Sequence, residues 1–314
     1  MNRIHASLIV ASALGLTANL SAQSLLWGLN FDDGTAGAVV SPSNVDGATP
    51  NPSGSINDVT GRGFFFGTSV REATVYSSDT PGGQGLSVNF TQQSTYLMTT
   101  LNSTTVSGTP VTGLDGRLNG LTAATASMWV KVESGLEGGD RFFTLGGNRV
   151  MGLMVSGPTS EAQDKTAFGL TVEGNGGSIG VVNATTFDAS DWLFLSLTMQ
   201  WSEENTIARL YAGSVSDEVE LIATFTVAPA PGGKSADVAN GLAVGGLANN
   251  ANRSFIGLMD DFRLYEGAGN IEFIESIRLS NLPEPQQIPE PASFAALAGL
   301  VGLGLAASRR RARR

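Results

Sequence analysis

The chain has 314 residues, of which 28 are acidic, 18 are Lys or Arg and none is Cys. Its only histidine, His5, lies near the N-terminus, so the rest of the chain has no imidazole or thiol for a metal, a nucleophile or a disulfide. Arg3 and five arginines at the C-terminus supply six basic residues, and the body between the two ends therefore carries 12 minus 28, or −16. A body this acidic repels phosphate backbones, so nucleic acid is not an expected partner.

Residues 1–22 have the pattern of a secretory signal peptide. Arg3 precedes an apolar segment from Ala6 to Leu20, and the small residues Ser21 and Ala22 precede the expected cut. Because fifteen apolar-rich residues are few for a membrane span, a cleaved signal is favoured over an anchor. We therefore expect export through the Sec translocon.

The body, residues 23–280, is predicted to be all β. It is rich in Gly, Thr, Ser, Asn and Val, and long helical periodicity is missing. Alternating apolar residues predict inward-facing rows on three strands. These rows are Met128, Val130 and Val132; Leu193, Leu195, Leu197 and Met199; and Val219, Leu221, Ala223 and Phe225. Glycine clusters at 81–83 and 174–177 predict turns, and many short strands favour a sandwich or jelly roll.

A series of motifs along the body resembles the laminin-G-like, concanavalin-A-like jelly-roll domains of exported bacterial proteins. The motifs are residues 29–34, 85–90, 126–131, the strand pair 191–197 and 208–213, and residues 255–265. The resemblance implies a jelly-roll β-sandwich that ends in a short helix. Ile271, Ile274 and Ile277 recur every third residue after the last motif, which also indicates one short amphipathic helix.

The same resemblance implies a structural calcium ion. In related jelly rolls the aspartate at the place of Asp260 binds calcium together with groups from the first strand, which here lie near Asp32. Calcium accepts oxygen ligands alone, so the missing His and Cys are no obstacle. In an unbroken strand Asp260 shares a face with Phe262 and Leu264 and points toward the core. The alternative is an aspartate bonded to backbone amides or to Arg263.

The sequence assigns no ligand-binding residues. Aromatic rings on a concave sheet could stack on sugars, and burial in the interior is the alternative for each of them. The candidates are Trp27, Trp129, Trp192, Trp201 and Tyr211.

The sequence also assigns no catalytic residues. Two groups of carboxylates could suggest glycoside hydrolysis. They are Glu203 with Glu204, and Glu133, Glu137 and Asp140. Jelly-roll glycosidases carry a Glu-x-Asp-x-x-Glu run, which this sequence lacks, so we interpret these acids as solvated loop residues and expect no enzymatic activity.

The C-terminus has three consecutive parts after a linker at 281–288. Pro289, Glu290 and Pro291 come first, and the uncharged residues 292–307 follow. The third part, which should stop transfer with its basic end in the cytoplasm, consists of Arg309, Arg310, Arg311, Arg313 and Arg314. Sixteen residues in a helix span ~24 Å, short of the ~30 Å hydrocarbon core, which favours a transient membrane helix.

These three parts, in this order in residues 289–314, resemble the PEP-CTERM sorting signal of exported bacterial proteins. The resemblance implies that an exosortase-type protease cuts near the Pro-Glu-Pro motif after transient membrane insertion. The alternative is a plain C-terminal anchor that is never cut.

We therefore expect an exported, non-enzymatic protein. It is held first in the inner membrane with its body outside the cytoplasm, and then at the cell surface or in extracellular matrix. Its body is expected to bind polysaccharide or another surface molecule. The alternatives are a purely structural matrix protein and a carbohydrate-active enzyme.

Overall fold

The computed structural model describes residues 23–32, 34–38, 65–66, 74–91, 97–99, 104–106, 109–111, 120–132, 138–146, 149–156, 167–188, 191–229, 242–247 and 253–283. Outside the described residues lie the predicted signal peptide, most of the linker, the Pro-Glu-Pro motif, the apolar run 292–307 and the arginine tail. Within the described ranges, no helix is long and apolar enough to cross a bilayer.

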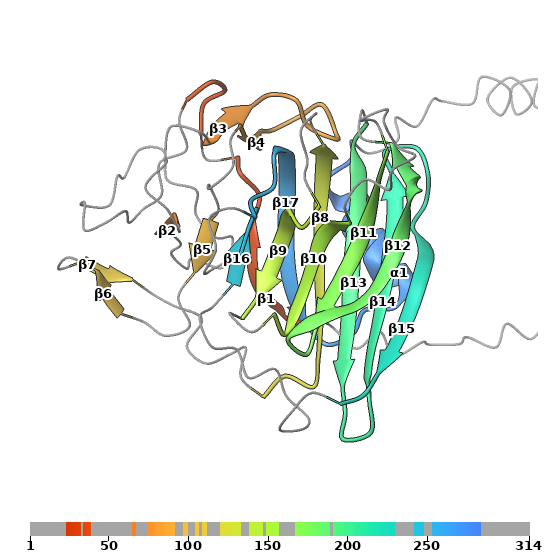
Figure 1. Cartoon of the computed structure of the whole chain (residues 1–314). Coiled ribbons are helices and arrows are strands. Elements are labelled where there is room, and N and C mark those ends of the chain that lie inside the picture. The colour runs from red at the N-terminus through yellow and green to blue at the C-terminus, as the bar shows by residue number, and fades with distance from the viewer. Residues whose placement is uncertain are drawn as a thin grey trace, which may run out of the picture.

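Two antiparallel sheets form a sandwich (Figure 1). The eight-stranded sheet runs in the order β15 (Glu220–Val227), β14 (Thr206–Ser214), β13 (Leu193–Trp201), β8 (Ala123–Val132), β17 (Gly257–Glu266), β4 (Ser87–Phe90) and β3 (Thr74–Ser77), with β1 (Leu25–Leu29) paired to β17. The seven-stranded sheet runs in the order β12 (Gly177–Asp188), β11 (Ala167–Gly174), β10 (Met151–Ser156), β9 (Arg141–Leu145), β16 (Leu242–Val244), β5 (Leu97–Thr99) and β2 (Phe65–Phe66). A separate hairpin joins β6 (Thr104–Val106) to β7 (Thr109–Val111). The predicted all-β, jelly-roll-type sandwich is confirmed.

The main core lies between the two sheets. The predicted rows on β8 and β13 both face it, and Leu153 and Val172 reach it from β10 and β11 of the opposite sheet. The rings of Trp27 and Phe143 both pack on Phe262, with centroids 5.7 and 5.6 Å away. Burying a large apolar side chain contributes about 1.5–3 kcal/mol, so these alternating rows account for the pairing of the sheets.

A second apolar cluster lies on the outer face of the eight-stranded sheet, where helix α1 (Ile271–Ser280) covers it (Figure 1). Ile274 and Ile277 of α1 are buried against the sheet, whereas Ile271 stays 39% exposed. The helix begins after Asn270, whose side chain accepts a hydrogen bond from the backbone N–H of Phe273 at 2.9 Å. The short amphipathic helix predicted from the isoleucine spacing is confirmed.

The prediction that Val219, Leu221, Ala223 and Phe225 all face inward is wrong, because a β-bulge in β15 separates Leu221 from Ala223. Leu210 of β14 pairs with Ala223, but the next residue, Tyr211, pairs with Leu221, so one residue of β15 has no opposite partner. Such an extra residue shifts all later side chains to the other face of the sheet. Ala223 and Phe225 therefore belong to the core side, whereas Leu221 lies on the outer face and is 49% exposed.

A bulge in β17 overturns the predicted orientation of Asp260 in the same way. Asp260 pairs with Trp129 of β8, and Arg263 pairs with Ser127, so two residues of β17 face one residue of β8. Asp261 in this bulge has a φ of 44°, a left-handed conformation that is uncommon for a non-glycine residue. Asp260 therefore shares the outer face with Trp129, whereas Phe262 and Leu264 point into the main core.

Candidate functional site

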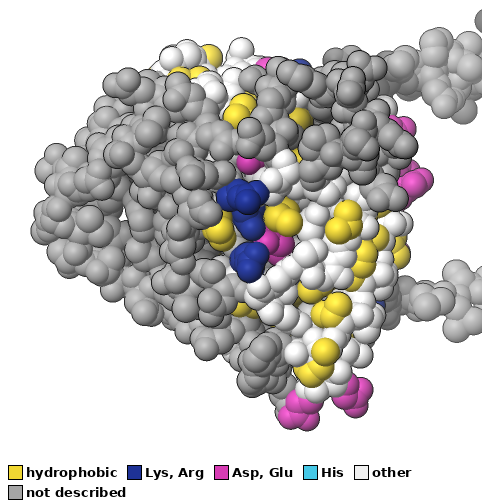
Figure 2. Space-filling model, in the orientation of Figure 1, with side chains coloured by type: hydrophobic (Ala, Val, Ile, Leu, Met, Phe, Trp, Pro, Cys, Tyr) yellow, Lys and Arg dark blue, Asp and Glu magenta, His cyan; other side chains and the backbone are white. Residues whose placement is uncertain are grey.

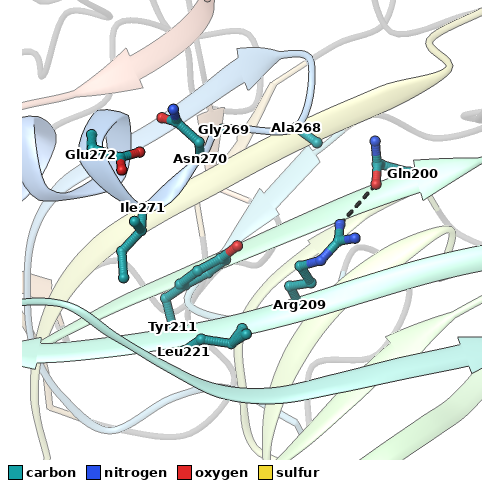
Figure 3. Close-up of a pocket in the computed structure, with 9 residues that line it drawn as sticks. All are labelled: Gln200, Arg209, Tyr211, Leu221, Ala268, Gly269, Asn270, Ile271 and Glu272. Carbon is teal, nitrogen blue, oxygen red and sulfur yellow. Dashed lines mark hydrogen bonds between the residues drawn. The ribbon is translucent and has the colours of Figure 1, made fainter. Parts of the chain in front are cut away.

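An open groove of about 480 Å³ lies on the outer face of the eight-stranded sheet, beside the first turn of α1 (Figure 3). Strands β13, β14 and β15 supply one wall, and the segment that leads from β17 into α1 supplies the other. The lining residues are Gln200, Arg209, Tyr211, Leu221, Ala268, Gly269, Asn270, Ile271 and Glu272.

The strand wall of the groove follows from the register of the sheet. Arg209 and Tyr211 alternate onto the outer face of β14, and the guanidinium of Arg209 donates a 2.8 Å hydrogen bond to the side-chain oxygen of Gln200 (Figure 3). Leu221 joins this wall only because the bulge in β15 turns it outward beside Tyr211. The strand wall thus combines the apolar side chain of Leu221 with the hydrogen-bonded pair Arg209 and Gln200.

The two walls carry opposite charges. Arg209 supplies a cation on the sheet, and Glu272 supplies a carboxylate in the first turn of α1. Burial raises the pKa of Tyr211, Arg209 acts in the opposite direction and Glu272 raises it further, so the phenol is neutral at physiological pH. Such a groove offers hydrogen-bond donors and acceptors together with apolar surface, which is the usual composition of a small-molecule site.

The aromatic residues considered for sugar stacking are buried. Trp27, Trp129, Trp192 and Trp201 are at most 7% exposed, so packing in the interior is their role. Tyr211 is also buried, but one part of it lines the groove. Arg209, Gln200 and Glu272 were not predicted from the sequence. A signal existed for two of them, because Gln200 in β13 and Arg209 in β14 are polar residues that alternate with the apolar residues of those strands.

Three aspartates lie close together where β1 ends beside β17. The Asp32 carboxylate accepts hydrogen bonds from the backbone N–H of Leu86 at 2.8 Å and from the side-chain amide of Asn30 at 3.3 Å. Asp260 and Asp261 are 6% and 1% exposed. The charge of Asp32 raises the pKa of both, so the two residues predicted from the sequence, Asp32 and Asp260, share one electrostatic environment.

Burial dominates the ionisation of this pair. It raises the pKa of Asp260 to about 8, the neighbouring charge of Asp261 adds to the rise, and a 2.7 Å hydrogen bond from the Asp261 backbone N–H opposes it. Burial also raises the pKa of Asp261 to about 6, against the effect of the Arg263 guanidinium, which donates to Asp261 Oδ1 at 2.7 Å. Without a further cation, Asp260 is protonated at neutral pH.

The donors of this cluster match calcium only in part. Asp261 Oδ2 is buried without a well-formed hydrogen bond among the described residues, although the side chain of Asn281 lies near enough to lower the pKa of Asp261. However, both oxygens of Asp32 already accept protein donors. No group of three or more His, Cys, Asp or Glu residues in the described ranges could hold a metal ion.

Of the acids considered for glycoside hydrolysis, the structure describes Glu203, Glu204 and Asp140. Glu203 and Glu204 are exposed in the turn between β13 and β14, as predicted. Asp140 is 1% exposed, so its prediction as a solvated loop residue is wrong. Glu133 and Glu137 lie outside the described residues.

Comparison with protein families identifies the C-terminal segment. Residues 287–311 match the PEP-CTERM protein-sorting motif. The match includes Pro289, Glu290 and Pro291 and the first three arginines of the tail, so the sorting signal predicted from the sequence is confirmed. The PEP-CTERM motif implies export, processing by an exosortase and association with the cell surface.

Solved structures of similar fold share little sequence with the chain. Domain 4 of the extracellular arabinanase AbnA from Geobacillus stearothermophilus, in complex with arabinotriose, is 14% identical, with a TM-score of 0.42 over 81% of this chain and 98% of that domain. The receptor-binding domain of botulinum neurotoxin type G is 11% identical, with a TM-score of 0.42 over 82% of this chain and 51% of that one. The enzymatically active domain of tailspike protein 2 of bacteriophage CBA120 is 10% identical, with a TM-score of 0.45 over 70% and 30%. No curated protein matches the chain.

Proposed function

We propose that this PEP-CTERM protein is a non-enzymatic carbohydrate-binding protein of the cell surface or extracellular matrix, and that sugar binds in the groove beside α1. The observation that carries the proposal is the groove itself, which places the Arg209 and Gln200 pair opposite Glu272 (Figure 3). In this proposal the sandwich crosses the inner membrane, the exosortase removes the C-terminal helix, and the body meets extracellular polysaccharide.

The side chains of the groove suit a sugar. A hexose presents hydroxyl groups at its rim, for which the guanidinium of Arg209 donates, the carboxylate of Glu272 accepts and the amide of Gln200 does both. It also presents an apolar C–H face, which the exposed surface of Leu221 and Ile271 can cover. Because Arg209 is already fixed by Gln200, part of the cost of ordering its side chain is met before the sugar arrives.

The same groove favours binding over hydrolysis. Glycosidases position two carboxyl groups across the scissile bond, about 5–9.5 Å apart. Glu272 is the one carboxylate that lines the groove in the described part of the chain. A carbohydrate-active enzyme is therefore the second choice, and a purely structural matrix protein without a ligand is the third.

The structural calcium ion at Asp32 and Asp260 stays a proposal; because the described acids form no group of three that could hold a metal ion, backbone oxygens or water would have to complete its ligands. The ion would replace the proton that burial otherwise leaves on Asp260. Its contribution would be to fix the end of β1 against β17.

A glycan array of neutral polysaccharides tests the proposed function. We expect the exported protein to retain at least one glycan, and Arg209→Gln and Leu221→Ala to weaken retention about tenfold, because each removes a contact in the groove. Leu279→Ala is the matched control, since Leu279 is also 49% exposed but lies outside the groove. Absence of any retained glycan would indicate the structural role, and release of reducing ends would indicate an enzyme.

A further inference from the structure

Three arginines form a connected network on the outer face of the seven-stranded sheet, the side of the sandwich opposite α1. Arg253 donates to the backbone oxygen of Gly138 at 2.7 Å, and Arg141 donates to that of Gly139 at 2.9 Å. Arg141 and Arg149 both donate to Glu173. In the space-filling view, basic side chains lie near the middle of the visible face, with acidic side chains beside them (Figure 2).

The centre of this network is a buried ion pair. Glu173 is 0% exposed and accepts two hydrogen bonds from Arg141, at 2.8 and 2.9 Å, in a bidentate arrangement. Gly152 lies opposite Glu173 in the pairing of β10 with β11, and a Cβ on Gly152 would come 3.2 Å from the carboxylate. Glycine therefore leaves the room that the carboxylate occupies. This pair satisfies Glu173, which also accepts a hydrogen bond from Arg149.

Among the described residues of the network, the charged side chains that reach solvent are arginines. Its two described acids are inaccessible, since Glu173 is fully buried and Asp140 is 1% exposed. The side chain of Arg149 is 38% exposed, and Arg253 is exposed as well. A local excess of accessible positive charge is unexpected on a body of net charge −16, because the average field there is negative.

The geometry of Arg149 keeps donors free for a ligand. One of its terminal nitrogens donates to the backbone oxygen of Gly176 at 2.7 Å, and the other lies 3.3 Å from Glu173. Its backbone has a φ of 55°, a conformation that costs free energy at a non-glycine residue and is frequent at functional positions. A guanidinium held by two fixed acceptors can still present its remaining N–H groups to an anion.

We propose that Arg149 and Arg253 form a binding site for an acidic polysaccharide, and that the carboxylate groups of its uronic acid residues are what the two guanidinium groups recognise. A carboxylate matches the planar fork of arginine in a bidentate pair. Nucleic acid fits less well, because it carries one charge per about 1.7 Å and the acidic body repels it, whereas a polysaccharide carries at most one carboxylate per sugar. The site lies on the other side of the sandwich from the groove and does not depend on it.

The test is binding of the exported protein to immobilised polygalacturonate, with neutral dextran and single-stranded DNA as separate arms. We expect retention on polygalacturonate that weakens as salt is added, and little retention on dextran. Arg149→Gln and Arg253→Gln should each reduce affinity for polygalacturonate about tenfold. Arg149→Lys should recover part of it, because the charge remains while the fork is lost.

Lys131→Gln is the control for charge. Lys131 lies on the other sheet, in β8, and forms an ion pair with Asp79 near the surface, so its replacement removes the same charge at little cost in stability. Affinity for polygalacturonate should change less than twofold in this variant. The proposal is overturned if the wild type is not retained, if all variants lose affinity equally, or if DNA binds more tightly with the same arginine dependence. If Leu221→Ala binds neutral glycans as well as the wild type, that result would contradict the proposed sugar site in the groove but not the arginine site.

Discussion

Phe225 of β15 lies directly over Gly180 of β12, so that a Cβ on Gly180 would collide with the phenyl ring. β15 ends one sheet and β12 ends the other, and this contact therefore joins the two free edges of the sandwich. The ring also packs against the main core. The missing side chain at Gly180 is thus a condition for closing the sandwich on this side.

Gly180→Val should destabilise the protein by about 1–3 kcal/mol, because the added methyl groups would displace the ring of Phe225 from the core. The midpoint of urea unfolding measures the loss. Gly177→Ala is the matched control, since no atom lies within 4 Å of a Cβ at this nearby position of β12. Equal stability of Gly180→Val and wild type would show that β12 and β15 can move apart without loss of free energy of unfolding.

Arg278→Met should loosen α1 from the sheet. Arg278 is 4% exposed, donates to the backbone oxygen of Ser214 at 2.7 Å and pairs with Glu275 at 2.6 Å. Replacing it leaves partly buried acceptors without a donor, for which we expect a loss of about 1–3 kcal/mol in the free energy of unfolding. Leu279→Ala, in the same turn but exposed, should change stability by less than 0.5 kcal/mol, within the ~0.5 kcal/mol typical of surface substitutions. Hydrogen exchange of the α1 amides would locate the change.

Local signals predicted much of this fold. The turn expected at 174–177 is a hairpin in which Asn175 and Gly176 have φ values of 53° and 90°, the conformation that an Asn-Gly pair favours. The row from Leu195 to Met199 faces the core because nothing interrupts the alternation of β13. The spacing of Ile274 and Ile277 predicted the buried side of α1 for the same reason.

Two of the errors, the orientation of Leu221 and that of Asp260, have one physical origin, a β-bulge in the strand that carries each residue. A prediction from alternating side chains assumes that each residue of a strand pairs with one residue of its neighbour. β15 has one extra residue next to the Tyr211 pair, and β17 has one extra residue near Asp261. Where a bulge forms depends on the pairing of strands far apart in the sequence. The groove also escaped prediction, because Arg209 and Glu272 meet only through the packing of α1 on the sheet.

Glu290→Ala should block processing of the sorting signal, because the change lies in the Pro-Glu-Pro motif within the matched segment 287–311. The uncut precursor, arginine tail included, should then accumulate in the membrane fraction, which mass spectrometry of the C-terminal peptide would detect. Glu284→Ala is a matched control in the second Pro-Glu-Pro sequence, at residues 283–285. Normal processing of Glu290→Ala would mean that the protease does not recognise the carboxylate of Glu290.

Calcium binding should depend on Asp260. Isothermal titration of calcium into the wild type should release heat from a single site, and Asp260→Ala should abolish it, because a calcium ion relies on carboxylate oxygens. Asp191→Ala, which removes an exposed carboxylate at the start of β13, should leave the heat unchanged. Identical heats in the wild type and Asp260→Ala would remove the metal from the proposal.

Stability measured in the presence of a chelator should fall as pH rises from about 4 to about 8. The pKa of Asp260 is about 8 in the folded protein against 3.8 for an unperturbed aspartate, so the folded state binds this proton more tightly. Its contribution to stability is fully present below pH 3.8 and is lost as pH rises through 8. Each unit of difference is worth about 1.4 kcal/mol, so a loss on the order of 2 kcal/mol or more is expected between pH 5 and pH 8.

Asp260→Asn should flatten this dependence, because an amide has no proton to lose and can still accept the hydrogen bond from the Asp261 backbone N–H. The remaining slope would come from Asp261, whose pKa of about 6 confines its effect to more acidic solution. Urea midpoints at pH 5 and pH 8 provide the measurement, with Asp191→Asn as a control that should keep the slope of the wild type. Parallel curves for Asp260→Asn and wild type would show that Asp260 is ionised without cost in its buried position, and would also remove the electrostatic reason for a cation there.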